Sequence, residues 1–393
     1  MRSCLFVILF ILSAVICHAN DSISPALPDT TLTYKPRIKP KSTKRDLVQI
    51  IADYIGSANK PRPAKKFDFS IIGGPYYTSD TKLGIGIVAA GVFRKDLNDT
   101  ITPPSQLNIY GDVSINGYYK VGVRGNNIFG RRGKEFTYDF SFESAPDKFW
   151  GIGYKMNSNN ANETRYKRWH ANADLSLLFR IAPDLYAGPR LLLDFLDGKK
   201  ITRPELWEGQ DSRTFTDGIG ASLVYDTRDN PFNAYSGLYL RMDQIFAPRF
   251  IGNKYAFSLT EITLCQYQKL WKGAILASRV HTRLTYGNTP WGLMSKFGGS
   301  YTMRGYWEGR YNDKCSADVT VELRQHIWRR NGLVIWGGIG EVFPKVNGIF
   351  RGQILYNFGI GYRWEFKKRI NVRLDYGFGR GESGLIFSIN EAF

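Results

Sequence analysis

The sequence of 393 residues predicts an all-β protein, a transmembrane antiparallel β-barrel, and three observations favour this fold. Segments of about ten residues alternate between apolar and polar side chains, a period that is typical of strands with one apolar face. Aromatic residues gather near the ends of these segments. The chain also ends in an aromatic residue, Phe393, after the alternating stretch GLIFSI. We expect sixteen strands, because about fifteen alternating segments follow Leu83 and a bacterial barrel has an even number of strands.

The composition narrows the class of protein. The formal net charge is +18, yet 43% of the residues are hydrophobic and 15% are aromatic. Disorder is not the default for such a chain, because disorder requires low hydrophobicity together with a high net charge. A basic chain rich in aromatic residues suits either nucleic acid or anionic lipid head groups. The N-terminal residues favour the second partner.

Residues 1–19 have the pattern of a secretory signal peptide. Arg2 precedes an apolar run at residues 5–12, and the tripeptide Cys-His-Ala at 17–19 is an acceptable cleavage site. Export makes nucleic acid an unlikely partner, so we expect none. After cleavage only Cys265 and Cys315 are left, and the sequence leaves open whether they form a disulfide or stay as free thiols.

Residues 20–66 form a basic, proline-rich segment that we expect in the periplasm. It includes KRDLVQIIADYIGSA, whose apolar residues recur at helical spacing and are followed by Gly56 as a stop signal. This short amphipathic helix, Leu47–Ile55, could plug the barrel, lie on the inner leaflet of the membrane or bind a periplasmic partner. A transient helix in a disordered tail is an equally good interpretation.

Residues 67–393 are assigned to the barrel. The longest apolar run, Gly84–Phe93, is about half of the ~20 residues that a spanning helix needs, so we expect strands to cross the membrane. In DVTVELR and INVRLDYGF the polar faces carry charges, whereas a water-soluble sandwich can use Ser or Thr there. We therefore expect one face of these strands to contact lipid and the other to face the lumen. The side chains expected to face lipid are those of Val319, Val321, Leu323, Val372 and Leu374. Those of Thr320 and Arg373 are expected to face the lumen. The aromatic residues expected in interfacial girdles are Phe149, Trp150, Trp169, Trp291, Trp307, Trp328 and Trp364.

Five segments in a fixed order resemble one known family. They are YDTRDNPFNAYSG (Tyr225–Gly237), FGGSYTMRGYWEGR (Phe297–Arg310), VELRQ (Val321–Gln325), GGIGEVF (Gly337–Phe343) and NVRLDYGFG with the terminal EAF. Together they are similar to the BamA/TamA-type outer-membrane barrel superfamily, also called the bacterial surface antigen family. The resemblance extends over roughly Ser79 to Phe393. Assembly members of this family usually carry periplasmic POTRA domains, and residues 20–66 do not fit one, because a globular domain rarely has fewer than about 50 residues.

The resemblance implies a role for Arg304-Gly305-Tyr306. In the family, the loop that holds this motif folds back into the barrel, where its arginine pairs with an acid on the inner wall. Gly305 would let the loop backbone approach the wall closely, and the planar guanidinium of Arg304 can grip a carboxylate at two points. Glu322, with Arg324 beside it, matches the family's acidic wall position. A plain surface loop is the alternative interpretation.

Three further assignments complete the site prediction. The family's second acidic wall position would fall at Gly338, and nearby Glu341 has the parity of the opposite strand face. We interpret the Asp-Asn-Pro motif after Tyr225 as a tight periplasmic turn with a structural role, in which Asp226 and Arg228 can pair beside Asp229. A C-terminal assembly signal is expected at Phe387, Ile389 and Phe393.

No catalytic set is visible in the sequence. His170, His281 and His326 lie far apart, without cysteine or carboxylate at metal-ligand spacing, so we expect no metal, no cofactor and no enzymatic activity.

Two classes of function remain. By resemblance, the chain is a monomeric barrel of the Gram-negative outer membrane that inserts or translocates protein or lipid through a weak seam between its first and last strands. Its expected partners are outer-membrane lipid, lipopolysaccharide and possible assembly proteins of the periplasm or outer membrane. The alternative is a passive channel or surface barrel. Leu83–Phe93, taken as the first strand, is rich in Gly and Ala, which slightly favours the weak seam.

Overall fold

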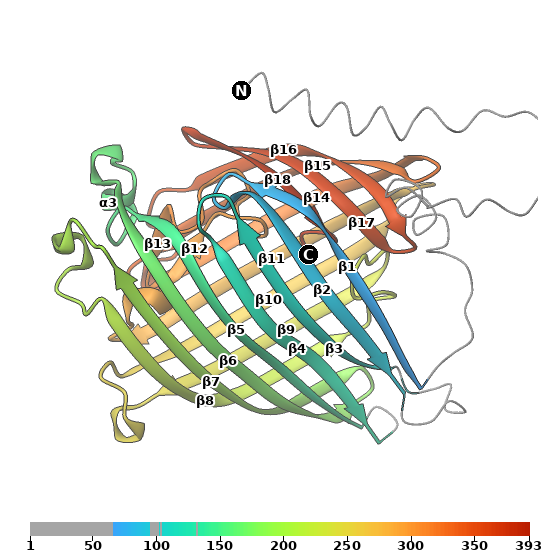
Figure 1. Cartoon of the computed structure of the whole chain (residues 1–393), viewed down its shortest axis with the longest axis horizontal. Helices are drawn as coiled ribbons and strands as arrows, with labels where there is room; N and C mark the ends of the chain where they lie inside the picture. Colours follow the sequence, from blue (N-terminus) through green and yellow to red (C-terminus); the bar gives the residue numbers. More distant parts are fainter. Residues whose placement is uncertain (1–65, 95–101, 103, 131–132) are drawn as a thin grey trace, which may run out of the picture. The chain divides into compact units, whose positions relative to one another are not determined.

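The computed structural model describes residues 66–94, 102, 104–130 and 133–393. The predicted signal peptide and the amphipathic helix at Leu47–Ile55 lie outside these residues. The described strands close into one antiparallel barrel, in which each strand pairs with its neighbours in the chain and β1 meets β18 (Figure 1). The expected all-β barrel of sixteen strands is therefore confirmed.

The barrel strands have the following bounds: β1 (Phe67–Thr78), β2 (Lys82–Phe93), β3 (Ser105–Ser114), β4 (Tyr119–Phe129), β5 (Lys134–Phe149), β6 (Thr164–Ala182), β7 (Leu185–Lys199), β8 (Arg213–Asp226), β9 (Gly237–Ala247), β10 (Phe257–Lys269), β11 (Ala274–Gly287), β14 (Cys315–Trp328), β15 (Asn331–Phe343), β16 (Leu355–Lys367), β17 (Ile370–Gly379) and β18 (Glu382–Ile389). β12 (Ser295–Phe297) and β13 (Tyr311–Asp313) form a separate two-stranded sheet in the connection between β11 and β14.

The helical segments are short and lie in the connections: α3 (Tyr154–Asn157), η1 (Asn160–Asn162), η2 (Pro204–Trp207), η3 (Arg249–Ile251), η4 (Trp291–Leu293) and η5 (Val346–Gly348). Among the described residues, no helix has both the length and the apolar character needed to cross a membrane. We call the end of the barrel that carries these segments the loop end. The opposite end, where short connections join β6 to β7, β10 to β11 and β14 to β15, is the turn end.

The first strand of the barrel differs from the prediction. Leu83–Phe93 lies in β2, and β1 precedes it. β1 pairs with β2 over its whole length, from Phe67↔Phe93 to Thr78↔Lys82. The sequence of β1, FDFSIIGGPYYT, alternates at its start but contains Gly73-Gly74-Pro75, residues that are typical of a turn. This interruption hides the strand from a reading of periodicity.

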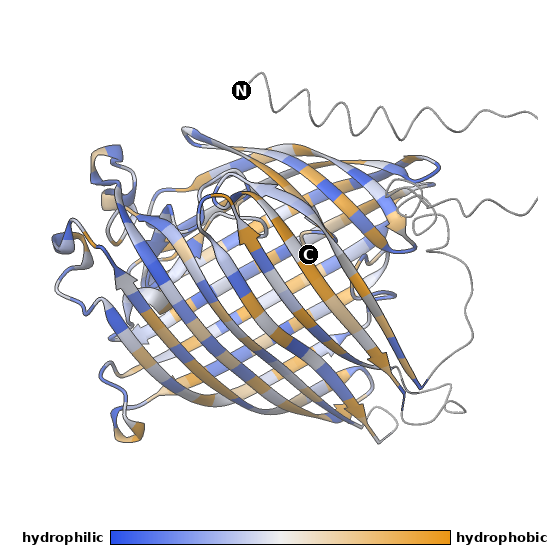
Figure 2. Ribbon diagram, viewed as in Figure 1, coloured by the Kyte–Doolittle hydropathy of each residue, from blue (hydrophilic) through white to orange (hydrophobic). Residues whose placement is uncertain are grey.

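Side chains alternate between the two surfaces of the wall as expected (Figure 2). Val319 and Val321 are exposed on the outer surface, whereas Thr320, Glu322 and Arg373 are buried in the lumen. The inside of the barrel is therefore its polar core, and the outer surface carries the apolar side chains that a lipid environment accepts.

Several predicted girdle residues lie inside the barrel. Trp169 and Trp328 are exposed, in agreement with an interfacial position. Phe149, Trp150 and Trp291 are 5%, 2% and 2% exposed, and the prediction is wrong for them. At the loop end, Trp291 packs with Phe149 and Trp207 in a buried cluster, because large aromatic side chains gain more from burial against one another than from a wet loop.

Candidate functional site

The connection between β11 and β14, residues 288–314, enters the barrel from the loop end; we call it the lumen loop. Its stem is the β12–β13 sheet, paired from Ser295↔Asp313 to Phe297↔Tyr311. Phe297 and Tyr311 pack with Met303 and Tyr306 in a buried cluster against the wall. The charged tip, which no apolar core could hold, is thereby anchored inside the polar lumen.

Arg304 is at the centre of the site. Its side chain is 1% exposed. Nη2 is bonded to Oε1 of Glu322, and Nη1 lies 2.7 Å from Oδ2 of Asp375. The guanidinium carbon also lies 3.9 Å from the ring centroid of Trp336, a cation–π contact. One loop residue thus binds β14, β15 and β17 together, and we call this arrangement the clamp.

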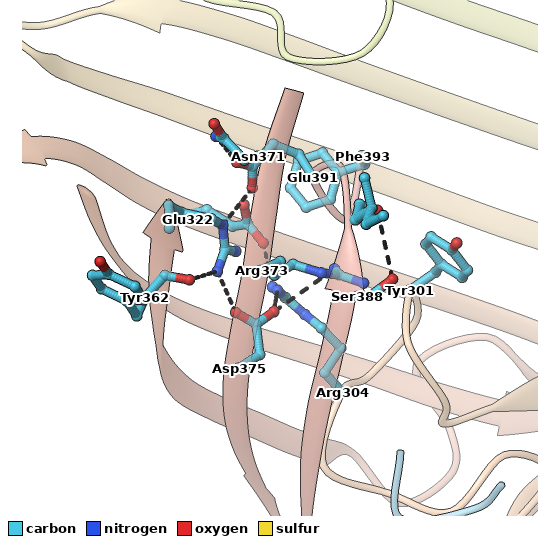
Figure 3. Close-up of polar contacts among 12 residues, drawn as sticks. Tyr301, Arg304, Glu322, Tyr362, Asn371, Arg373, Asp375, Ser388, Glu391 and Phe393 are labelled. Carbon is cyan, nitrogen blue, oxygen red and sulfur yellow. Dashed lines mark hydrogen bonds and ion pairs between the residues drawn. The ribbon is translucent and has the colours of Figure 1, made fainter. Parts of the chain in front are cut away.

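The clamp continues along the wall as a network of buried ion pairs (Figure 3). Nε of Arg324 donates to Oε2 of Glu322 at 2.9 Å. Arg363 on β16 is bonded to the second oxygen of Asp375, and its Nε donates to Glu391 at 2.8 Å. Each carboxylate is therefore shared by two guanidinium groups. Removing one member leaves the others buried without a full set of partners, which costs more than the pair itself contributes.

The second acid of the clamp is Asp375, which sequence reasoning did not name. Gly338, the position expected from the family, is packed on its inner side against Asn357 and carries no acid. Glu341 instead accepts hydrogen bonds from the backbone nitrogens of Phe350 and Gly352 and so orders the β15–β16 connection. The alternation in INVRLDYGF places Asp375 on the polar face of its strand. This was the signal in the sequence that could have identified Asp375 as a lumen acid.

Gly305 allows the loop backbone to touch the wall directly. Its φ is +111°, and a Cβ there would lie 2.7 Å from the carbonyl carbon of Gly377. A Cβ on Gly377 would in turn lie 2.7 Å from the carbonyl oxygen of Arg304. Two glycines therefore face each other because neither segment has room for a side chain. Nδ2 of Asn357 donates to the same Arg304 oxygen at 3.1 Å.

The tip of the lumen loop contacts the wall on both sides of the junction between β1 and β18. The hydroxyl of Tyr306 donates to the backbone oxygen of Tyr356 at 2.8 Å and accepts from the backbone nitrogen of Arg380 at 2.7 Å. The backbone nitrogen of Trp307 donates to Glu382 at the start of β18. The next residue, Glu308, donates from its backbone nitrogen to Asp80 in the β1–β2 turn at 3.3 Å. The tip therefore bridges the first and last strands at the loop end.

The motif after Tyr225 is longer than the tight turn expected. Residues 227–236 form an arm at the turn end, in which Asn230 accepts two backbone hydrogen bonds, from Phe232 and Asn233, as the Asx argument predicted. Nε and Nη2 of Arg228 grip both carboxylate oxygens of Asp226, at 2.9 and 2.8 Å.

The arm is attached to a distant part of the wall. Arg369, in the β16–β17 turn, donates to Oδ2 of Asp229 at 2.9 Å and to the backbone oxygen of Asn233 at 2.7 Å. Its guanidinium carbon lies 3.4 Å from the ring centroid of Tyr235. Ala234 belongs to a buried cluster with Cys265 and Tyr267 of β10 and Ala277 of β11. The arm therefore runs along the inside of the turn end, from β9 to the β16–β17 turn. Its own side chains and Arg369 supply partners for its backbone polar groups and for the carboxylate of Asp229.

Of the residues assigned to a C-terminal signal, Phe387 and Ile389 lie two apart on one face of β18, and Phe393 lies elsewhere. Phe387 pairs with Tyr77 across the seam, and Ile389 is exposed on the outer surface. Phe393 lies inside the barrel, where its backbone oxygen accepts from Nη2 of Arg324 at 2.9 Å. Its ring centroid lies 6.5 Å from that of Tyr267.

The remaining sequence questions have plain answers. Cys265 and Cys315 are both free and buried. Among the described residues, no group of three or more His, Cys, Asp or Glu side chains has the geometry to hold a metal ion.

Comparisons with known proteins agree with this architecture. Residues 108–383 match the Omp85 superfamily domain. None of the curated protein sequences matches the chain significantly. Among solved structures, BamA from Haemophilus ducreyi lacking POTRA domains 1-3 is similar with a TM-score of 0.57 at 13% identity, over 84% of this chain and 70% of that one.

Two structures of CdiB are similar to a comparable degree. For the Acinetobacter baumannii protein the TM-score is 0.53 at 12% identity, over 83% of this chain and 60% of that one. For the Escherichia coli protein it is 0.56 at 8% identity, over 84% and 64%. This chain thus spans less than two thirds of either CdiB chain. At such identities the likeness shows a common barrel fold.

Proposed function

We propose, from the premise that this chain belongs to the Omp85 superfamily, that it inserts protein or lipid into the outer membrane, or translocates it, by opening the seam between β1 and β18. The family gives the setting, an integral β-barrel of the Gram-negative outer membrane. The activity within that setting is our proposal. A passive barrel that keeps its seam closed is the competing function.

The weak seam is the observation that carries the proposal. In the described part of the chain, β1 and β18 pair at two positions, Tyr77↔Phe387 and Thr78↔Ile386. The neighbouring strand pairs are continuous. β1 pairs with β2 starting at Phe67↔Phe93, and β17 pairs with β18 as far as Val372↔Ile389. Because each cross-strand pair contributes roughly 0.2–1 kcal/mol, the seam is the junction that parts at the lowest free energy.

An opened seam has a specific chemical use. Strand edges present a row of backbone donors and acceptors, to which another extended segment can add by β-augmentation. A parted β1 edge offers such a template at membrane depth, where an unpaired backbone is costly and a client strand satisfies it. This supports a role in inserting strands of other proteins.

A disulfide across the seam tests the proposal. The variant Tyr77→Cys with Phe387→Cys joins a register pair of the seam, and the control Tyr77→Cys with Leu83→Cys joins a register pair inside the β1–β2 hairpin. Both use the same position in β1. The native free cysteines are buried and do not compete.

The expected result separates the two functions. In cells that lack the native gene, the oxidised seam variant should fail to restore the protein and lipid composition of the outer membrane, and reduction should restore it. The hairpin control should act like the unmodified chain. Equal restoration by both oxidised variants, or no change of composition on deleting the gene, would rule out a function through the seam and leave the passive barrel.

The partners follow from the same proposal. We assign the binding of separate periplasmic assembly proteins to the basic segment 20–66. Deleting it while keeping residues 1–19 should leave a folded barrel that no longer affects outer-membrane composition. Increased leakage of small solutes through the deleted variant, without a change of composition, would show instead that this segment closes the lumen.

A further inference from the structure

A chamber of about 260 Å³ lies inside the barrel, between the lumen loop and the arm at the turn end. The wall strands β10 and β11 form its sides, and Tyr301 of the lumen loop forms one boundary. The lining includes three cationic residues, Arg228, Arg279 and His281, and three aromatic residues, Tyr267, Tyr301 and Phe393. Among these described lining residues there is no aspartate or glutamate. The side chains that line the chamber are therefore cationic, hydroxyl-bearing or apolar.

The positive groups of the lining are held in place by acids that lie behind them. Nε2 and Nδ1 of His281 lie 3.0 and 3.1 Å from carboxylate oxygens of Glu261 and Asp318. Both ring nitrogens must donate to make these contacts, which is the charged form of the ring. Arg279 donates to the backbone oxygen of Tyr301 at 2.8 Å, with its nearest carboxylate, Asp318, at 3.7 Å. These cations are fixed before any ligand arrives.

Arg373 supplies an independent sign that an anion belongs here. Its side chain is 0% exposed, and none of its three nitrogens has a hydrogen-bond partner among the described residues. Its nearest carboxylate, Asp375, is 3.7 Å away and already serves Arg304 and Arg363. A buried guanidinium that has one long ion pair and no hydrogen-bond partner is unfavourable, so its presence calls for a group that completes it.

Arg373 lies next to Tyr301, an aromatic residue that lines the chamber. Arg373 extends from β17 toward Tyr301, and its guanidinium carbon lies 5.7 Å from the centroid of that ring (Figure 3). Tyr301 is 60% exposed, so its ring can turn aside without breaking buried packing. Nη1 of Arg324 also has no partner among the described residues, and Arg324 lies 5.2 Å from the ring of Phe393, another lining residue. Guanidinium nitrogens without hydrogen-bond partners therefore lie next to two aromatic side chains of the lining, Tyr301 and Phe393.

We propose that the chamber is a binding site for a phosphate group, with Arg373 and Arg279 as its guanidinium donors and the Tyr301 ring as a movable wall. A phosphate carries more charge than a carboxylate and several acceptor oxygens, which suits guanidinium groups that approach from two sides. The chamber is larger than a bare phosphate, and its tyrosine and phenylalanine faces suit an organic ester. The phosphate can come from a free phosphate compound or from a lipid head group.

Calorimetry on the folded full-length barrel in a zwitterionic detergent without phosphate tests this site. Inorganic phosphate, glycerol 3-phosphate and dihexanoyl phosphatidic acid are titrated at constant ionic strength, with sodium chloride as the blank. Tighter binding of phosphatidic acid assigns the lipid source, and tighter or equal binding of the water-soluble compounds assigns the free source. If none of the three binds, the proposal is wrong.

Two variants connect binding to the chamber. Arg373→Gln should lower the affinity at least about tenfold, because it removes charged hydrogen bonds. The same change should leave the unfolding midpoint of the unliganded barrel equal or higher, because it removes a cation without partners. A merely structural arginine gives the opposite, a lower midpoint. Arg213→Gln, on a side chain bonded to Asp197 outside the chamber, is the matched control and should bind normally. If Arg373→Gln does not fold, Arg279→Gln carries the same affinity test, and unchanged affinity in the folded variant overturns the assignment.

Discussion

Two junctions in the C-terminal part of the wall are held in opposite ways. At the clamp, Arg304 joins β14 to β17 through buried carboxylates, and the backbones of Gly305 and Gly377 touch. At the seam, one strand further on, β1 and β18 pair at two positions. The seam is otherwise tied at its loop end, where the hydroxyl of Ser79 accepts from the backbone nitrogen of Leu385 at 3.1 Å.

This difference shows where the barrel is rigid and where it can part. The clamp holds β14–β17 as one block, so the strain of an opening seam is confined to the strands next to it. Weak pairing alone would make the whole edge of the sheet fray, since edge strands gain stability only from their neighbours. Under the proposed function, a rigid block beside a weak junction would give one defined opening.

Removing the clamp is the largest expected effect. Arg304→Ala leaves Glu322 and Asp375 buried with fewer partners, and should lower the free energy of unfolding by roughly 3–5 kcal/mol. Glu322→Ala should cost about as much. The measurement is urea unfolding of the folded barrel, followed by the electrophoretic mobility of unheated samples. Because the two residues share a contact, the double variant should lose less than the sum of the single changes, and additive losses would contradict the clamp.

The backbone contact of the loop gives the next effect. Gly305→Ala should cost roughly 1–3 kcal/mol, because the new Cβ meets the Gly377 backbone and the positive φ is strained. Gly117→Ala is the control: its φ is +86°, but nothing lies within 4 Å of the added Cβ. The control measures the strain of φ alone. If both variants unfold at the same urea concentration, the close approach does not contribute to stability.

The free energy of unfolding should depend on pH through Asp80, which lies in the β1–β2 turn beside the seam. Burial, with the carboxylate of Glu308 beside it, raises the pKa of Asp80 to about 8. Because this pKa lies above that of the unfolded chain, the folded state holds the proton longer, and stability falls as pH rises from about 4 to 8. One group contributes at most about 1.4 kcal/mol per pH unit. Asp80→Asn should flatten this slope, and an unchanged slope in that variant would exclude Asp80 as its source.

Detaching the arm at the turn end is the smallest expected effect on stability. Arg369→Ala removes two hydrogen bonds and a cation–π contact at a partly exposed site, worth about 1 kcal/mol. The more sensitive readout is thiol labelling, because Ala234 of the arm and Cys265 belong to the same buried cluster. Maleimide should modify Cys265 several-fold faster in the variant. Cys315, which lies away from the arm, is the internal control, and equal acceleration of both thiols would indicate general loosening.

The same contrast shows how much the sequence could tell. The barrel was predictable because side-chain direction alternates along every strand, and that signal is local. The pairing of Arg304 with Glu322 came from resemblance to a family. Asp375 was visible on a polar face, but its partner is 71 residues away and no local pattern encodes such a contact.

The arm was misread for the same physical reason. Its Asp, Asn and Pro residues describe a tight turn when only neighbours are considered. Arg369, which attaches it to the wall, lies 140 residues beyond Asp229. Trp150 and Trp291 were placed in the girdle because residue type indicates an amphipathic ring but not which side of the wall it faces.

The clamp also dictates an order of events during biogenesis. Arg304 leaves the ribosome before either of its acids, and Asp375 follows 71 residues later. A growing or partly inserted chain therefore carries an arginine whose site does not yet exist, and the lumen loop can be seated only after β17 has joined the sheet. Such long-range contacts form late in folding. Closure of the loop thus reports that β17 has joined the sheet, because a chain interrupted before β17 lacks the carboxylate of Asp375 that holds Arg304.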